Sequence, residues 1–151
     1  ILFGATSTNS ARMKFFKNAV SLQAPILQIK VIKKGEGVGY NHKFIADKKT
    51  YIATAKIGYA DGLDRKLSDK KLKVFFNNNI FELIGRISMD LITFKVNKAT
   101  YEMFSKNTNK IYFVELINDK QSPSDIAKLL DTIPHEILTR ISDRVDRKIV
   151  K

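Results

Sequence analysis

The chain has 151 residues, 44% of them hydrophobic, which suits one globular domain with its own core. It has no cysteine, which excludes disulfides and thiolate metal sites, and no apolar run near the roughly 18 residues that a transmembrane helix needs. Its net charge of +12 raises nucleic acid as a partner class.

The make-up of that charge argues against nucleic acid. Six of the 27 basic residues are Arg, so 21 are Lys, and they are scattered along the chain. Specific recognition of phosphates and bases favours the bidentate Arg fork. We therefore interpret the lysines as a solvated surface. No secretory leader is visible, so we expect no membrane partner and take the cytoplasm as the default location.

The first 19 residues differ from the rest. Residues 1–4, "ILFG", look like part of a strand, and residues 5–19 are polar and small, then basic and aromatic. We interpret 1–19 as the end of a preceding strand plus a linker, and 20–151 as the domain. The chain begins with Ile, so we expect it to be processed or to belong to a longer protein.

Short β-type runs follow, separated by Gly-rich, Asp-Lys-Lys and Asn-rich turns. Apolar and polar residues alternate, and no helical period appears in this part of the chain. The spacing of about 8–14 residues predicts an antiparallel barrel or sandwich. The predicted runs are 21–40 with its turn at 35–39, 44–46, 50–57, 72–78, 80–87, 91–96 and 111–117.

Two or three short helices are expected near the carboxy terminus. Residues 98–106 fit one short helix. A second begins at Ser122, a capping residue followed by Pro123 in the first turn. A third begins at Pro134 and places apolar residues on one side. The last stretch, 143–151, is interpreted as a closing strand.

Several candidate sites are better explained by ordinary structure. Asp61 and Asp64 flank a turn, and Asp-Gly is common turn chemistry. His42 and His135 lie far apart and have no partner at metal-ligand spacing, so no metal is expected. The "GEGVG" stretch, 35–39, lacks the Lys-Ser/Thr of a phosphate loop and fits a hairpin turn.

Tyr59 and the stretch "GRISMD", 85–90, remain as candidates. Taken alone, Tyr59 reads as a packed aromatic, Arg86 as a surface charge and Met89 as core filler. Yet Tyr59 stands between Gly58 and a small alanine where a strand should end. A packing tyrosine does not need such small neighbours, whereas they suit a tyrosine whose hydroxyl must be held in one place.

The two stretches together change that interpretation. "IGYADGLDRKLS" (57–68) followed by "IGRISMDL" (84–91) resembles the carboxy-terminal domain of alanine racemases. "ILQIKVIKKGEGVGY" (26–40) and "IPHEILTRISDRVDR" (133–147) are similar to further parts of that domain, in the same order. The resemblance extends from about Val20 to Arg147.

This resemblance implies a fold and an activity. The family's enzymes join an amino-terminal (β/α)8 barrel, whose lysine binds pyridoxal 5′-phosphate, to a largely β domain, and they form head-to-tail homodimers. They interconvert L- and D-alanine and supply D-alanine for peptidoglycan. We therefore predict a mainly β chain: an antiparallel, Greek-key-like barrel with two or three short helices near its carboxy terminus.

The resemblance also implies residue roles. Tyr59 matches the base that removes the α-proton of L-alanine, while the barrel lysine serves the opposite face. Met89 matches the position whose backbone contacts the substrate carboxylate, and Arg86 matches a residue at the substrate entrance. Racemisation needs one proton-transfer group on each face of the same carbon. A free phenol, with a pKa of about 10, is a poor base, so nearby positive charge is implied, largely from the barrel.

Three departures limit the match. The barrel and its lysine are missing, so we expect the chain alone to be inactive. His135 replaces the family's tyrosine that contacts the cofactor phosphate, although an imidazole can still donate a hydrogen bond. "DRVDR" (143–147) replaces the usual P-R-V-P-R. The alternatives are a racemase of broader specificity, or a non-catalytic relic or Lys-rich barrel that binds nucleic acid or a protein partner.

Overall fold

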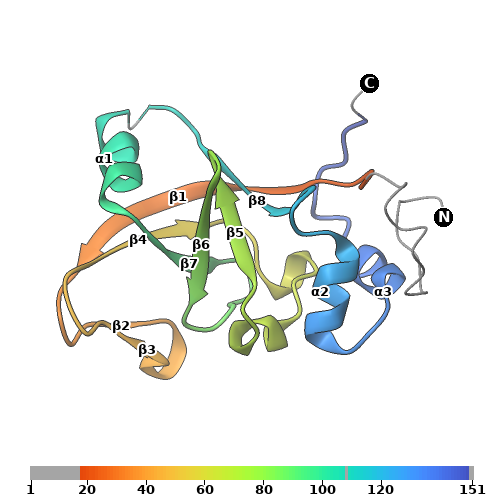
Figure 1. Ribbon diagram of the computed structural model, residues 1–151, viewed down its shortest axis with the longest axis horizontal. Helices are drawn as coiled ribbons and strands as arrows, with labels where there is room; N and C mark the ends of the chain where they lie inside the picture. Colours follow the sequence, from red (N-terminus) through yellow and green to blue (C-terminus); the bar gives the residue numbers. More distant parts are fainter. Residues whose placement is uncertain (1–17, 108, 150–151) are drawn as a thin grey trace.

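A closed antiparallel barrel forms the body of the molecule in the computed structural model, which describes residues 18–107 and 109–149. Six strands pair in the order β1-β4-β7-β6-β5-β8, and β2 and β3 form a separate hairpin (Figure 1). The predicted fold class is thereby confirmed. The strands are β1 (Leu22–Ile32), β2 (Gly37–Val38), β3 (Phe44–Ile45), β4 (Thr50–Ala55), β5 (Lys73–Phe76), β6 (Asn79–Ile84), β7 (Ile92–Val96) and β8 (Phe113–Ile117).

Strand β7 buries every second side chain, as its sequence pattern predicts. In β7, Ile92, Phe94 and Val96 are buried, and the two residues between them are partly exposed. Successive side chains of a strand point to opposite faces, so one face of β7 fills the barrel. The predicted turn at "GEGVG" (35–39) is only partly right. Glu36 N–H closes a turn onto the Lys33 carbonyl at 3.1 Å, but Gly37 and Val38 form strand β2, which pairs antiparallel with β3.

The long first strand closes the barrel. Its carboxy-terminal part pairs with β4, and its amino-terminal part pairs with β8. Closure leaves no barrel edge on which a further strand could pair. The predicted closing strand is wrong for the described residues 143–149, which form no strand. Instead, Val145 N–H donates to the Ser142 carbonyl (3.1 Å), and the Arg147 side chain donates to the Ile141 carbonyl (2.9 Å), so the segment folds back on itself.

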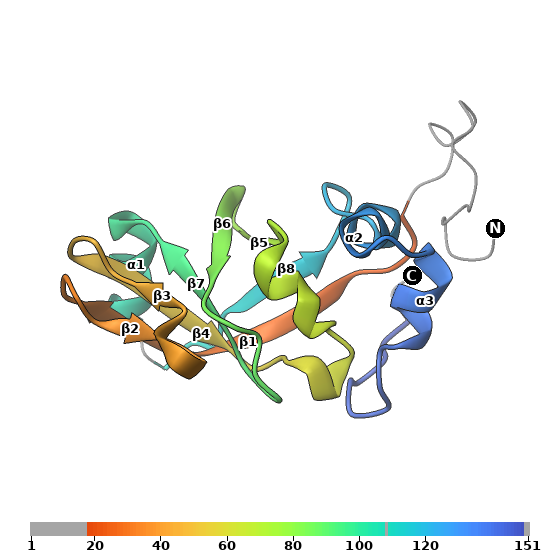
Figure 2. The same cartoon turned by 90° about the horizontal axis from the view of Figure 1, so that it is seen from below.

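Three short α-helices complete the described part of the chain: α1 (Lys98–Lys106), α2 (Pro123–Leu130) and α3 (Pro134–Thr139). They confirm the expected helices. Ser122 caps α2 in a capping box with Asp125, and Pro123 occupies its first turn. Helices α2 and α3 gather at the end of the molecule away from α1 (Figure 2). No helix within the described residues is long and apolar enough to cross a membrane.

The predicted strand end at 1–4 and most of the predicted linker, 5–17, lie outside the described residues. The first described strand begins at Leu22.

Candidate functional site

Tyr59 lies in a tight turn that follows β4. Residues 58–62, here called the tyrosine turn, include the 3₁₀ segment Tyr59–Asp61. The Asp61 carboxylate accepts the Gly58 N–H at 2.8 Å and fixes the start of the turn. Gly62 ends it with a φ of 113°, a region that favours glycine. The Tyr59 side chain is 48% exposed, so the packed-aromatic interpretation is wrong.

The second motif lies in the loop after β6. We call residues 87–91 the methionine loop. The Ser88 hydroxyl donates to the Leu91 carbonyl and accepts the Leu91 N–H, both at 3.0 Å, which closes the loop on itself. Ile87 is fully buried, whereas Met89 is 52% exposed. Met89 is therefore not core filler.

The two motifs are joined through their backbones. Tyr59 N–H donates to the Ser88 carbonyl, and Ala60 N–H donates to the Met89 carbonyl, both at 3.0 Å. A Cβ at Gly58 would lie 2.3 Å from the Met89 carbonyl oxygen. The methionine loop thus fixes the backbone from which the Tyr59 phenol projects.

The backbone N–H and carbonyl of Met89 differ in whether they have a hydrogen-bond partner. Within the described residues, this N–H donates no hydrogen bond, while the carbonyl accepts one from Ala60. An unpaired N–H beside an exposed loop side chain can bind an external acceptor, and a carboxylate is a strong one.

The carboxy-terminal segment packs on the other side of the tyrosine turn. Ser142 N–H donates to the Asp61 carbonyl at 3.2 Å. A Cβ at Gly62 would lie 2.4 Å from the Arg140 carbonyl oxygen. Gly62 is therefore required both by its backbone conformation and by this contact.

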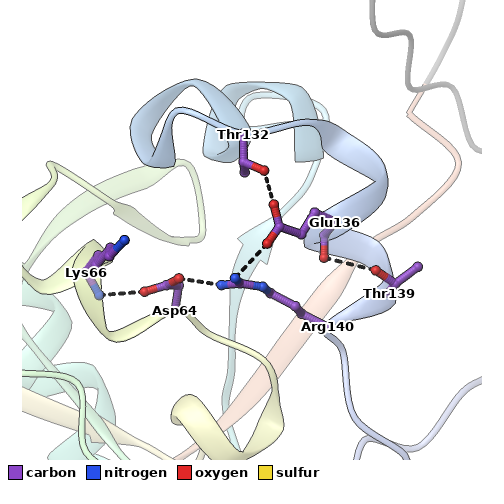
Figure 3. Close-up of polar contacts among 6 residues, drawn as sticks. All are labelled: Asp64, Lys66, Thr132, Glu136, Thr139 and Arg140. Atoms are coloured by element: carbon purple, nitrogen blue, oxygen red, sulfur yellow. Dashed lines mark hydrogen bonds and ion pairs between the residues drawn. The ribbon is translucent and has the colours of Figure 1, made fainter.

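A chain of charged groups links Asp64, two residues after the tyrosine turn, to α3 (Figure 3). Arg140 forms ion pairs with Asp64 and, at 2.6 Å, with Glu136, and Glu136 accepts a hydrogen bond from Thr132. Asp64 also accepts the Lys66 N–H at 2.8 Å, which caps the 3₁₀ segment Arg65–Asp69. Partial burial acts to raise the pKa of Asp64, but the Lys66 N–H and Arg140 outweigh it and hold the pKa below its ordinary value of 3.8.

Arg86 and His135 both occupy exposed positions. Arg86 follows Gly85, and its side chain forms no ion pair within the described residues. His135 lies in the first turn of α3, one residue before Glu136. Among the described residues, no hydrogen bond joins either side chain to Tyr59. The structure therefore joins the backbones of the Tyr59 and Met89 motifs, and among the described residues no hydrogen bond or ion pair joins Arg86 or His135 to Tyr59 or Met89.

Sequence reasoning missed the two arginines that hold the site. Asp61 and Asp64 are turn residues, as predicted, but each also pairs with an arginine of the carboxy-terminal segment: Asp61 with Arg144 and Asp64 with Arg140. The partners stand about 80 residues apart in the sequence, and no local spacing rule connects them. The run "TRISDR" (139–144), quoted for its resemblance, was the available signal.

Together these features define a β-barrel domain that presents an exposed tyrosine on a turn held by two distant segments, the methionine loop and the carboxy-terminal segment. The model of the family described as alanine racemase, C-terminal domain, matches residues 19–149. The chain therefore belongs to that family.

Individual relatives agree with this assignment. An alanine racemase of Helicobacter pylori strain J99 is 35% identical over 153 residues, covering 99% of this chain and 40% of the relative. The alanine racemase of Clostridium difficile 630 in complex with cycloserine aligns with a TM-score of 0.82 and 33% identity, over 97% of this chain and 38% of that one. An alanine racemase of Bartonella henselae with covalently bound pyridoxal phosphate aligns with a TM-score of 0.76 and 34% identity, over 89% and 36%. The chain thus spans about 40% of the length of the curated relative from strain J99.

Proposed function

We propose that this chain supplies the carboxy-terminal domain of a pyridoxal phosphate-dependent alanine racemase, in which Tyr59 removes the α-proton of L-alanine. One observation carries the proposal. The Tyr59 phenol is 48% exposed, while hydrogen bonds to the methionine loop fix its backbone. A group that transfers protons must be both accessible and held within hydrogen-bond reach of its target.

Met89 and Arg86 take the roles that the resemblance gives them. The Met89 N–H, which donates no hydrogen bond within residues 18–107 and 109–149, supports a contact between this backbone and the substrate carboxylate. Its carbonyl is already bonded to Ala60, so the N–H is the group left for the ligand. Arg86 is exposed, and its positive charge would attract a carboxylate toward the entrance.

The described residues fit part of a cofactor site. Pyridoxal phosphate, when bound, supplies the electron sink that lets the α-proton leave. His135 is exposed at the start of α3, where its imidazole can donate a hydrogen bond to the phosphate. The lysine that binds the cofactor is proposed to lie on a (β/α)8 barrel outside the matched domain.

The proposal extends to the whole protein. We assign residues 20–151 to the β domain and residues 1–19 to the end of the last strand of the (β/α)8 barrel plus a linker. The start of β1 at Leu22 supports this boundary. The partner subunit of a homodimer would supply the barrel that faces Tyr59. The product D-alanine would serve peptidoglycan synthesis, and the cytoplasm is the proposed location.

A chimera tests the proposal. The carboxy-terminal part of the Helicobacter pylori strain J99 relative, which aligns over 99% of this chain, is replaced by the chain. The chimera is expected to racemise alanine, and the chain alone is expected not to. A folded, cofactor-loaded chimera without racemisation would overturn the proposal. Racemisation by the chain alone would contradict the proposal that the cofactor-binding lysine lies on a separate (β/α)8 barrel. Equal rates on larger amino acids would favour the broader-specificity racemase.

A further inference from the structure

Arg144 bridges the tyrosine turn and the methionine loop through Asp61 and Asp90. Its Nε is 3.6 Å from the Asp61 carboxylate, and its Nη2 is 2.5 Å from the Asp90 carboxylate. The planar guanidinium can present different N–H groups to two carboxylates at once, which a single ammonium does less well. One side chain therefore contacts both motifs.

The Asp61 carboxylate transmits this contact to Tyr59. One of its oxygens faces Arg144, and the other accepts the Gly58 N–H at 2.8 Å. Gly58 directly precedes Tyr59, so the orientation of this carboxylate sets the start of the turn. The Asp61 side chain is only 12% exposed, which limits its freedom to reorient.

Asp90 transmits the contact to the other motif. It directly follows Met89, whose carbonyl accepts the Ala60 N–H. Without Arg144, the Asp61 and Asp90 carboxylates would be left as two like charges around a vacated position, and their repulsion would push the motifs apart.

We propose that Arg144 is a positioning residue for Tyr59: it clamps Asp61 to Asp90 and so holds the tyrosine turn on the methionine loop. The effect on catalysis rests on the proposed function, whereas the effect on the turn does not. Arg144 touches neither substrate nor cofactor in this account; it acts through the two carboxylates.

Amide hydrogen exchange on the 151-residue chain tests the clamp directly. The N–H groups of Tyr59 and Ala60 report the two hydrogen bonds between the motifs. Arg144→Ala is expected to speed their exchange by up to about five-fold, the upper end of the range for a partly exposed charge pair. Arg144→Lys keeps the charge and should fall between Arg144→Ala and the wild type.

Arg147→Ala is the matched control. This arginine belongs to the same segment but contacts Asp143 and backbone carbonyls of 141–145. It should leave exchange at Tyr59 and Ala60 unchanged. Unchanged exchange in Arg144→Ala, or equal acceleration in Arg147→Ala, would overturn the proposal. If Arg144→Ala fails to fold, Asp90→Asn removes one contact only and should give a smaller acceleration of the same amides.

Kinetics in the chimera separate positioning from general damage. Arg144→Ala should lower racemisation while the α-proton of D-alanine still exchanges with solvent deuterium, because the group on the opposite face does not depend on Tyr59. Equal loss of both activities, or loss of neither, would contradict the positioning role. An inactive wild-type chimera would refute the proposed function, and the amide exchange would still decide on the clamp.

Discussion

Gly58 lies so close to Met89 that a Cβ on it would come within 2.3 Å of the Met89 carbonyl oxygen. The φ of Gly58 is −150°, an extended value that other residues adopt, so the contact and not the backbone conformation requires glycine here. The contact with Met89 gives Gly58 a structural role. This glycine lets the two motifs meet.

A methyl group at Gly58 should separate the motifs. Gly58→Ala is expected to cost about 1–3 kcal/mol of unfolding free energy, the range for forced overpacking. Urea unfolding measures the loss, and faster amide exchange at Tyr59 locates it. A variant as stable as the wild type, with unchanged exchange, would show that the methionine loop accommodates the methyl group without a loss of stability.

The Asp64–Arg140 pair should make stability depend on acid pH. The pKa of Asp64 is lowered in the folded chain, so the carboxylate stabilises the fold above its ordinary value of 3.8, and this contribution is lost as the pH falls through the folded value. Asp64→Asn keeps an oxygen for the Lys66 N–H but removes the charge. It should cost about 1 kcal/mol or less at pH 7, because Arg140 is partly exposed.

The sign of the effect is tested by repeating urea unfolding at descending pH. The difference between wild type and Asp64→Asn should shrink below pH 3.8. A difference that stays constant into strong acid would mean that the carboxylate charge does not stabilise the fold.

Gln121 should be a strong stabiliser of the barrel. Its buried amide accepts the Lys73 N–H at 3.2 Å and donates to the carbonyls of Lys73 and Leu116 at 2.9 and 2.7 Å, which ties β5 to β8. Gln121→Leu leaves these groups unpaired and should cost about 1–3 kcal/mol. Gln28→Leu, on the exposed side of β1, is the control and should change stability by about 0.5 kcal/mol or less. Equal losses of stability in Gln121→Leu and Gln28→Leu would contradict the stabilising role of the Gln121 hydrogen bonds.

Met89 should act through its backbone. Met89→Ala keeps the N–H and should leave chimera racemisation within about three-fold of wild type, since the side chain is exposed. Met89→Pro removes the N–H and should raise the KM for alanine by about ten-fold, the loss of one hydrogen bond to a charged group. Circular dichroism checks that both variants fold. A KM raised equally by both would show that the side chain binds the substrate instead.

The sequence predicted the barrel elements well because their patterns are local. The alternation in β7 and the Ser122-Pro123 start of α2 each lie within a few residues, and both are confirmed. The assignment of 143–151 as a strand was wrong for the described part, because strand formation there needed a free edge that barrel closure removes.

The site was only partly predictable. Tyr59 and Met89 emerged from two motifs and a family resemblance, but their exposure depends on how the turns project from the barrel. The pairing of Arg144 with Asp61 and Asp90 joins segments that meet only in the folded chain. The charged residues can be identified from the sequence, but their pairing depends on which segments the fold brings together.

Proton exchange by the Tyr59→Phe chimera tests the central claim most directly. Phenylalanine keeps the ring and removes the hydroxyl. Racemisation and α-proton exchange of L-alanine should fall by about 10²–10⁴-fold, the usual contribution of one acid–base group. The α-proton of D-alanine should still exchange with solvent deuterium. Wild-type exchange from L-alanine in this variant would contradict the role of Tyr59.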